Sequence, residues 1–223
     1  VDLAEQIPGP ASDRLARAAA EARIHVVAGL TERAGSRIFN TSVLISPSGE
    51  MLLRHRKINV LDIAQDLYSI GDSLQVAETA LGTMGVPICA DNFSTSLVLG
   101  HSLARMGAQI LLSPAAWAVP TDHENDAEPY GETWRVSFST LARLYDLTVI
   151  GVSNVGWMNA GPWEGRKCIG CSLAVGPGGE ILGQAPYGEN AEVLMTVPIE
   201  PQPPIGRGTT IADVLKKRGY DGP

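Results

Sequence analysis

The sequence has few cysteines, no excess of basic charge and no long hydrophobic run. Three cysteines among 223 residues are too few, and odd in number, for a secreted disulfide scaffold, which favours a reducing, cytoplasmic setting. A net charge of −7 without a run of Lys or Arg argues against a nucleic-acid-binding protein. No apolar stretch approaches the roughly 18 residues of a membrane span, and the first ten residues lack the order of a signal peptide. Together with the charge, this leads us to expect neither a nucleic-acid nor a membrane partner.

The composition that is present is that of a packed globular domain. Hydrophobic residues make up 44% of the chain and charged residues 18%, without a low-complexity tract. A chain of this length suits one domain and can bury a core without disulfides. We find neither a linker nor an internal repeat, so one domain is expected.

Apolar spacing predicts alternating helices and strands. Helices are expected at 11–24, 94–108 and 133–146, and strands at 25–33, 109–117, 147–156 and 191–200. Two further segments, 40–57 and 168–185, predict hairpins that turn at 46–49 and 176–179. Ser12 or Asp13 is expected to cap the first helix and Ser94 the second. Hairpins combined with αβ crossovers imply a mixed sheet, so the predicted fold class is α/β.

The segment TMGVPICADNFS, residues 83–94, raises the question of what Cys89 does. A strand that ends at Cys89 and a helix that begins near Ser94 would place the thiol beside a helix N-terminus. Unpaired N–H groups and the helix dipole would lower the pKa of Cys89 there, and the same N–H groups could hold an oxyanion. The alternative is an inert core thiol, because free cysteine is among the most buried residue types.

An ordered series of motifs runs through almost the whole chain. It begins with AEQIPGP, VVAGLTER and FNTSVLISPSGE, continues through LLRHRKINVLD, YSIGDSL, LGTMGVPICADNF and ARMGAQILLSPAAW, and ends with VIGVSNVG and GCSLAVGPGGEIL. This series resembles the nitrilase superfamily of carbon–nitrogen hydrolases. The resemblance implies a four-layer α-β-β-α sandwich over residues 1–200, a Pro-rich tail over 201–223, and a homodimer or larger homo-oligomer.

The resemblance also implies roles for two residues. Cys89 would be the nucleophile that attacks an amide or nitrile carbon and forms a thioester, and Lys57 would stabilise the negative charge on the substrate oxygen. The alternative for Lys57 is a solvated lysine at a strand end. The expected substrate is a small linear amide, with nitrile and N-carbamoyl compounds left open. This chemistry needs no cofactor and no metal.

The sequence departs from the family pattern in its carboxylates. The family's general-base Glu precedes the segment that here reads AEQIPGP, so the domain is expected to be N-terminally incomplete, lacking a strand–helix–strand unit. A second family Glu is missing from 58–68, where Asp62 or Asp66 could stand in. Either the native protein is longer, or this is a catalytically inactive binding or scaffold protein that keeps the fold.

Further candidates lie in and near the acidic loop 118–134. Substrate-pocket roles are predicted for Trp117, Tyr130, Glu132, Trp134 and Asn154. Glu132 or Glu128 would select a polar or cationic group, unless the loop is an ordinary solvated one. Cys168 and Cys171 form a C-x-x-C whose thiols would point to opposite faces of a strand, so no metal site is expected.

Overall fold

The computed structural model of the protein describes residues 3–206 and 208–222. The helices are α1 (Pro10–Ala22), α2 (Leu97–Arg105), α3 (Glu132–Tyr145) and α4 (Ile211–Lys217). The strands are β1 (Val26–Ala34), β2 (Arg37–Ile45), β3 (Met51–Arg56), β4 (Ala77–Thr79), β5 (Gly82–Gly85), β6 (Ile110–Ala115), β7 (Ala118–Val119), β8 (Thr148–Ser153), β9 (Val155–Trp157), β10 (Lys167–Ile169), β11 (Leu173–Val175) and β12 (Ile181–Gln184).

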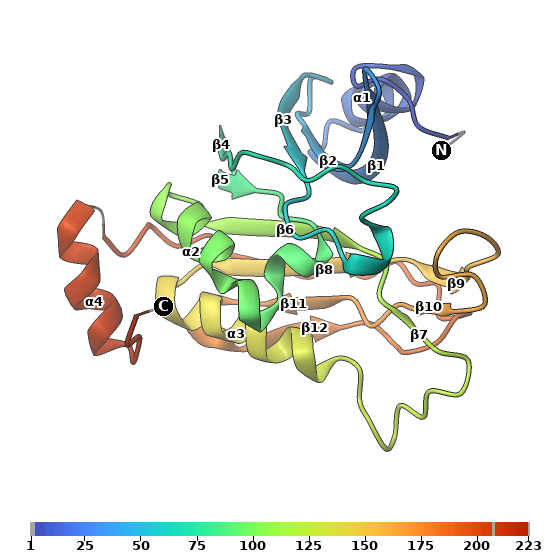
Figure 1. Ribbon diagram of the computed structural model, residues 1–223. Helices are drawn as coiled ribbons and strands as arrows, with labels where there is room; N and C mark the ends of the chain where they lie inside the picture. Colours follow the sequence, from blue (N-terminus) through green and yellow to red (C-terminus); the bar gives the residue numbers. More distant parts are fainter. Residues whose placement is uncertain (1–2, 207, 223) are drawn as a thin grey trace.

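Two sheets form the central layers of the molecule (Figure 1). One has the strand order β1-β2-β3 and is antiparallel throughout. The other has the order β12-β11-β8-β6-β5-β4, with β5, β6 and β8 parallel and the outer strands antiparallel. The predicted mixed sheet is therefore confirmed. A small sheet, β7-β10-β9, extends beyond one end of the larger one.

Helices cover the outer face of each sheet. Ala19 of α1 packs against Val43 and Ile45 of β2, which point away from the larger sheet. Their neighbour Leu44 points the other way and meets Ile110 of β6 between the sheets, as the alternation of a strand requires. On the far face of the larger sheet, α2 and α3 bury the main hydrophobic cluster. The expected four-layer α-β-β-α sandwich is confirmed.

The hairpin predicted at 40–57 and the predicted αβ units are present, but several local predictions were wrong. The hairpin predicted at 168–185 forms only from Leu173 onward, because Gly170 and Cys171 have positive φ and separate it from β10. Gly9, not Ser12 or Asp13, is the N-cap of α1, because Pro10 takes the first helical position. Two single 3₁₀ turns, η2 (Cys89–Asn92) and η3 (Ser94–Ser96), delay α2 to Leu97, so Ser94 does not cap it. The strand expected at 191–200 forms no ladder, and Pro198 lacks an N–H for one.

The C-terminal segment packs on the helical layer of its own chain. Ile211 and Leu215 of α4 are buried in the cluster that α2 and α3 form. Arg218 places its guanidinium 2.7 Å from a carboxylate oxygen of Asp146, just after α3. Within the described ranges, no helix combines the length and hydrophobicity that crossing a bilayer requires.

Candidate active site

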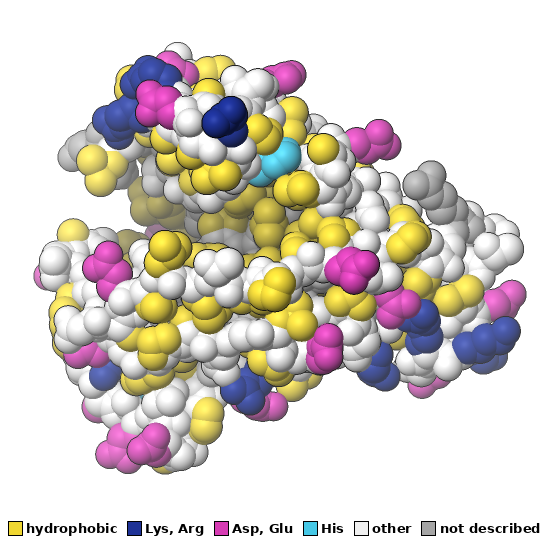
Figure 2. All heavy atoms as spheres, turned by 180° about the vertical axis from the view of Figure 1, so that it is seen from behind, with side chains coloured by type: hydrophobic (Ala, Val, Ile, Leu, Met, Phe, Trp, Pro, Cys, Tyr) yellow, Lys and Arg dark blue, Asp and Glu magenta, His cyan; other side chains and the backbone are white. Residues whose placement is uncertain are grey.

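An open cleft of about 870 Å³ lies between the two sheets on the side of β1 and β8. The sheets contact each other through β2, β3, β5 and β6, and Gly29 of β1 lies close to Pro114 of β6. Residues of β1 and β8 line the cleft. Figure 2 shows this hollow from behind, with hydrophobic side chains along its walls. Val152 of β8 is 58% exposed for this reason.

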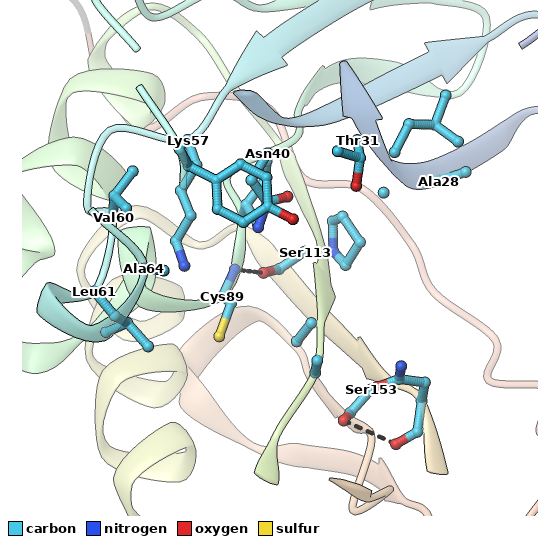
Figure 3. A pocket seen from close by; sticks show the side chains of 18 of the residues that line it. Ala28, Thr31, Asn40, Lys57, Val60, Leu61, Ala64, Cys89, Ser113 and Ser153 are labelled. Carbon is cyan, nitrogen blue, oxygen red and sulfur yellow. Dashed lines mark hydrogen bonds between the residues drawn. The ribbon is translucent and has the colours of Figure 1, made fainter. Parts of the chain in front are cut away.

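Cys89 lies in this cleft at the start of η2. The predicted strand ends earlier, at Gly85, because Pro87 interrupts the ladder before Cys89 is reached. The backbone of Cys89 has φ +43°, which is in the left-handed region that non-glycine residues seldom adopt. Its N–H donates to Ser113 Oγ of β6 at 3.1 Å (Figure 3). A cysteine held in a strained turn, facing a cavity, fits a nucleophile better than a core thiol.

The protonation state of Cys89 differs from the sequence-based expectation. Burial raises the pKa of the Cys89 thiol, and this effect outweighs the opposing ones. The ammonium of Lys57 and the backbone N–H groups of Ala116 and Ala90 lower the same pKa by stabilising the thiolate. The net direction is therefore opposite to the expected lowering, because burial disfavours the thiolate of Cys89 more than the neighbouring groups stabilise it.

Lys57 is a buried residue rather than a solvated one. Its backbone extends the ladder beyond β3, since its N–H donates to the carbonyl of Asn40 at 2.8 Å. The carbonyl of Lys57 accepts the N–H of Gly71 at 2.8 Å. The residue is 6% exposed and lines the cleft on the same side as Cys89. The structure thus brings the positive charge of Lys57 and the sulfur of Cys89 into one cavity.

Asp91 connects the segments that carry these two residues, and sequence reasoning missed it. Its carboxylate accepts the N–H of Ile58 at 3.1 Å and that of Asn59 at 2.8 Å, directly after Lys57. It also accepts the N–H of Ile88 at 2.9 Å and contacts His55 Nε2 at 2.9 Å. Its place in the motif ICAD was the available signal. Asp91 therefore positions Lys57 relative to Cys89.

Replacing Asp91 by Ala is expected to destabilise the fold by about 3 kcal/mol or more, because three backbone N–H groups and a buried imidazole lose their partner. Urea unfolding followed by circular dichroism measures this change. Asp62→Ala is the matched control, since Asp62 is exposed and bonds to Gln65 on the surface. Equal midpoints for the two variants would contradict this role of Asp91.

The other predicted site residues are divided between the cleft and the core. Asn154 lines the cleft. Trp117 and Trp134 do not, because they stack on each other in the main core with ring centroids 4.7 Å apart. Gly151 explains this placement: a Cβ there would lie 3.0 Å from the Trp117 ring, so the glycine leaves room for the indole on the helical side of the sheet.

The acidic candidates lie on the surface. Glu128 and Glu132 are exposed and do not line the cleft, and neither do Asp62 and Asp66. Each of these four residues was predicted from its position in the sequence between helices and strands, and that position does not determine the direction of its side chain. Tyr130 packs beside Cys89 at the edge of the core, outside the cleft lining, and burial raises its pKa to about 12.

Several polar residues of the cleft were missed. They are Thr31, Asn40, Tyr68, Ser113 and Ser153. Asn40 lies on a strand whose apolar pattern gave no sign of a site, and Ser113 interrupts the apolar run ILLSPAAW, which was the available signal. Within residues 3–206 and 208–222, no group of three or more His, Cys, Asp and Glu side chains is gathered as metal ligands would be.

Comparison with known proteins places the chain in a family. The carbon–nitrogen hydrolase family profile matches residues 1–202. Omega-amidase NIT2 of Xenopus tropicalis is 33% identical over 130 residues, which cover 54% of this chain and 46% of that protein. Omega-amidase NIT2-B of Xenopus laevis is 27% identical over 226 residues, covering 90% and 75%.

The fold has solved counterparts as well. A carbon–nitrogen hydrolase from Helicobacter pylori superposes with a TM-score of 0.72 at 23% identity, over 81% of this chain and 64% of that one. The chain thus spans about half of the first of these relatives and under two thirds of the solved structure. Because the family profile matches residues 1–202 of this chain, the chain belongs to the carbon–nitrogen hydrolase family of the nitrilase superfamily.

Proposed function

We propose that this protein hydrolyses the carbon–nitrogen bond of a small amide, with Cys89 as the nucleophile. The observation that carries the proposal is the strained Cys89 facing the same cleft as the buried ammonium of Lys57. The named omega-amidases among the relatives support amides over nitriles. The presence of the Cys89 thiol and the Lys57 ammonium in one cleft favours a catalyst over an inactive binding protein.

The reaction follows from the placement of these groups. The Sγ of Cys89 loses its proton to a base and attacks the amide carbon, and the carbonyl oxygen takes up the negative charge. Lys57 and the N–H groups of Ala90 and Ala116 supply positive charge beside the sulfur, where the negative charge on that oxygen develops. Collapse of the intermediate breaks the C–N bond, and the nitrogen leaves as ammonia with the transferred proton. Water then cleaves the thioester and releases the acid.

None of the buried carboxylates is proposed as the base. Because burial raises the pKa of the Cys89 thiol, attack needs a proton acceptor. The buried carboxylates of the described residues have other partners. Asp91 holds the Lys57 and Ile88 segments, and Glu32 bonds to Arg56 at 2.6 and 2.9 Å and to Thr41 at 2.8 Å.

The lining of the cleft favours an uncharged amide. Apart from Lys57 and His25, its described residues carry no Lys, Arg, Asp, Glu or His side chain, and most are aliphatic. A substrate that carries a charge would lose its hydration there, since Lys57 is assigned to the reacting oxygen and His25 is the other ionisable group among those named. We therefore expect the full-length protein to hydrolyse butyramide with a kcat/KM at least about 10-fold above that for succinamate or 4-aminobutyramide.

Ammonia release from these three amides tests both statements. Hydrolysis of none of them, by folded full-length protein, would contradict the proposed amidase. Hydrolysis of a charged amide at a rate equal to that of butyramide would contradict the neutral selectivity alone. The homo-oligomeric state and the cytoplasmic location stay predictions from the sequence.

A further inference from the structure

Ser113 is a buried side chain beside Cys89 to which the reaction as described gives no task. It lies on β6, is 2% exposed and borders the cleft. Figure 3 shows its hydroxyl directed at the backbone nitrogen of Cys89 rather than at the sulfur. A serine in the middle of a buried parallel strand is costly to bury unless its hydroxyl is bonded, so its partners indicate its role.

The partners of Ser113 form a closed ring with Cys89 and Asn92. Ser113 Oγ accepts the N–H of Cys89 at 3.1 Å and a side-chain N–H of Asn92 at 2.9 Å. The same amide nitrogen of Asn92 also donates to the carbonyl of Cys89, at 3.3 Å. Both backbone polar groups of Cys89 are thereby bonded within the ring. Asn92 is itself buried, at 1% exposed.

The ring acts on the residue whose backbone is strained. Cys89 has φ +43°, and a strained conformation persists where its surroundings over-determine it. The 3₁₀ turn supplies little of that constraint, since η2 has four residues. Hydrogen bonds from a rigid strand supply more, because β6 is paired with β8 along its whole length, Ser113 included, and with β5 at Ile110 and Leu111.

We propose that Ser113, with Asn92, is a positioning residue that holds Cys89 in its left-handed conformation, so that Sγ faces the cleft beside Lys57. This role rests on the proposed nucleophile but not on the identity of the substrate. Loss of the hydroxyl frees the N–H of Cys89, the turn relaxes, and the sulfur moves away from Lys57 and from the N–H groups of Ala90 and Ala116.

The test is the rate of Cys89 alkylation by iodoacetamide as a function of pH, measured together with kcat and KM in the full-length protein. Ser113→Ala is expected to shift the alkylation profile to higher pH and to lower kcat about 10- to 100-fold, with KM nearly unchanged. Ser113→Thr keeps the hydroxyl and should restore most of both. Ser137→Ala is the matched control, since Ser137 is buried and bonds within α3 to Thr133.

A Ser113→Ala protein with the wild-type alkylation profile and kcat would overturn the proposal. If that variant does not fold, Asn92→Ala opens the same ring from its other side and is expected to shift the profile in the same direction, and its failure to do so would also overturn the proposal. Alkylation does not require turnover. A wild-type protein that hydrolyses no amide would therefore contradict the proposed function, while the Ser113 effect on the thiol would still be measured.

Discussion

Replacing Cys89 by Ala in the full-length protein is expected to lower kcat/KM for amide hydrolysis by about 10,000-fold or more. The substitution removes the atom that forms the thioester, and loss of a covalent nucleophile costs at least this much in hydrolases. The substitution leaves the backbone hydrogen bonds of the turn in place, because the N–H of Cys89 and not its sulfur is bonded to Ser113. The melting temperature should therefore stay near that of the wild type while ammonia release is lost.

Cys171→Ala is the matched control for this experiment. Cys171 is also a free thiol, but it is buried, packs in the main core and does not line the cleft. We expect kcat/KM to stay within about 3-fold of the wild type, with a stability loss of about 1 kcal/mol from the smaller side chain. If the two variants kept equal activity, Cys89 would have no covalent role.

Replacing Lys57 by Met is expected to lower kcat by about 100- to 1,000-fold, the usual cost of removing one stabilising group from a developing oxyanion. Met fills the space of the lysine stem without its charge. The substitution should also slow alkylation of Cys89 between pH 7 and 9. The positive charge of Lys57 lowers the pKa of that thiol against the effect of burial, so its removal raises the pKa further and leaves less thiolate.

Lys57→Arg separates charge from shape at the same position. The guanidinium keeps the positive charge but is planar and larger than the ammonium. Because the backbone of Lys57 is fixed by its bonds to Asn40 and Gly71 and the residue is 6% exposed, we expect Arg to recover less than a tenth of the lost kcat. Lys216→Met, on the exposed side of α4, should leave kcat unchanged. Full activity of Lys57→Met would contradict a role for the ammonium in catalysis.

The order of elements could be predicted from the sequence because their signals are local. The turns at 46–49 and 176–179 and the apolar runs of β6 and β8 identify themselves within a few residues. The association of Lys57 with Cys89 came from motif resemblance. Nothing local predicts it, because the bonds that hold the two segments together run from Asp91 across more than thirty positions.

The details of the site depended on side-chain direction, which spacing alone does not give. Trp117 was predicted in the pocket because of its place at the end of a strand. Its ring instead packs on the helical side of the sheet, where Gly151 has no side chain to occupy the space. The pKa of Cys89 was misjudged for a related reason. The helix that was to lower it begins eight residues later, at Leu97, and burial is the larger effect.

Intact-mass analysis of the full-length protein, quenched in acid during turnover of butyramide, tests the central claim most directly. The account predicts a covalent butyryl adduct in the intact mass, located by peptide mapping on the peptide that contains Cys89, released by hydroxylamine and absent from Cys89→Ala. Steady ammonia release with no adduct on that peptide, and with undiminished turnover in Cys89→Ala, would contradict the thioester mechanism.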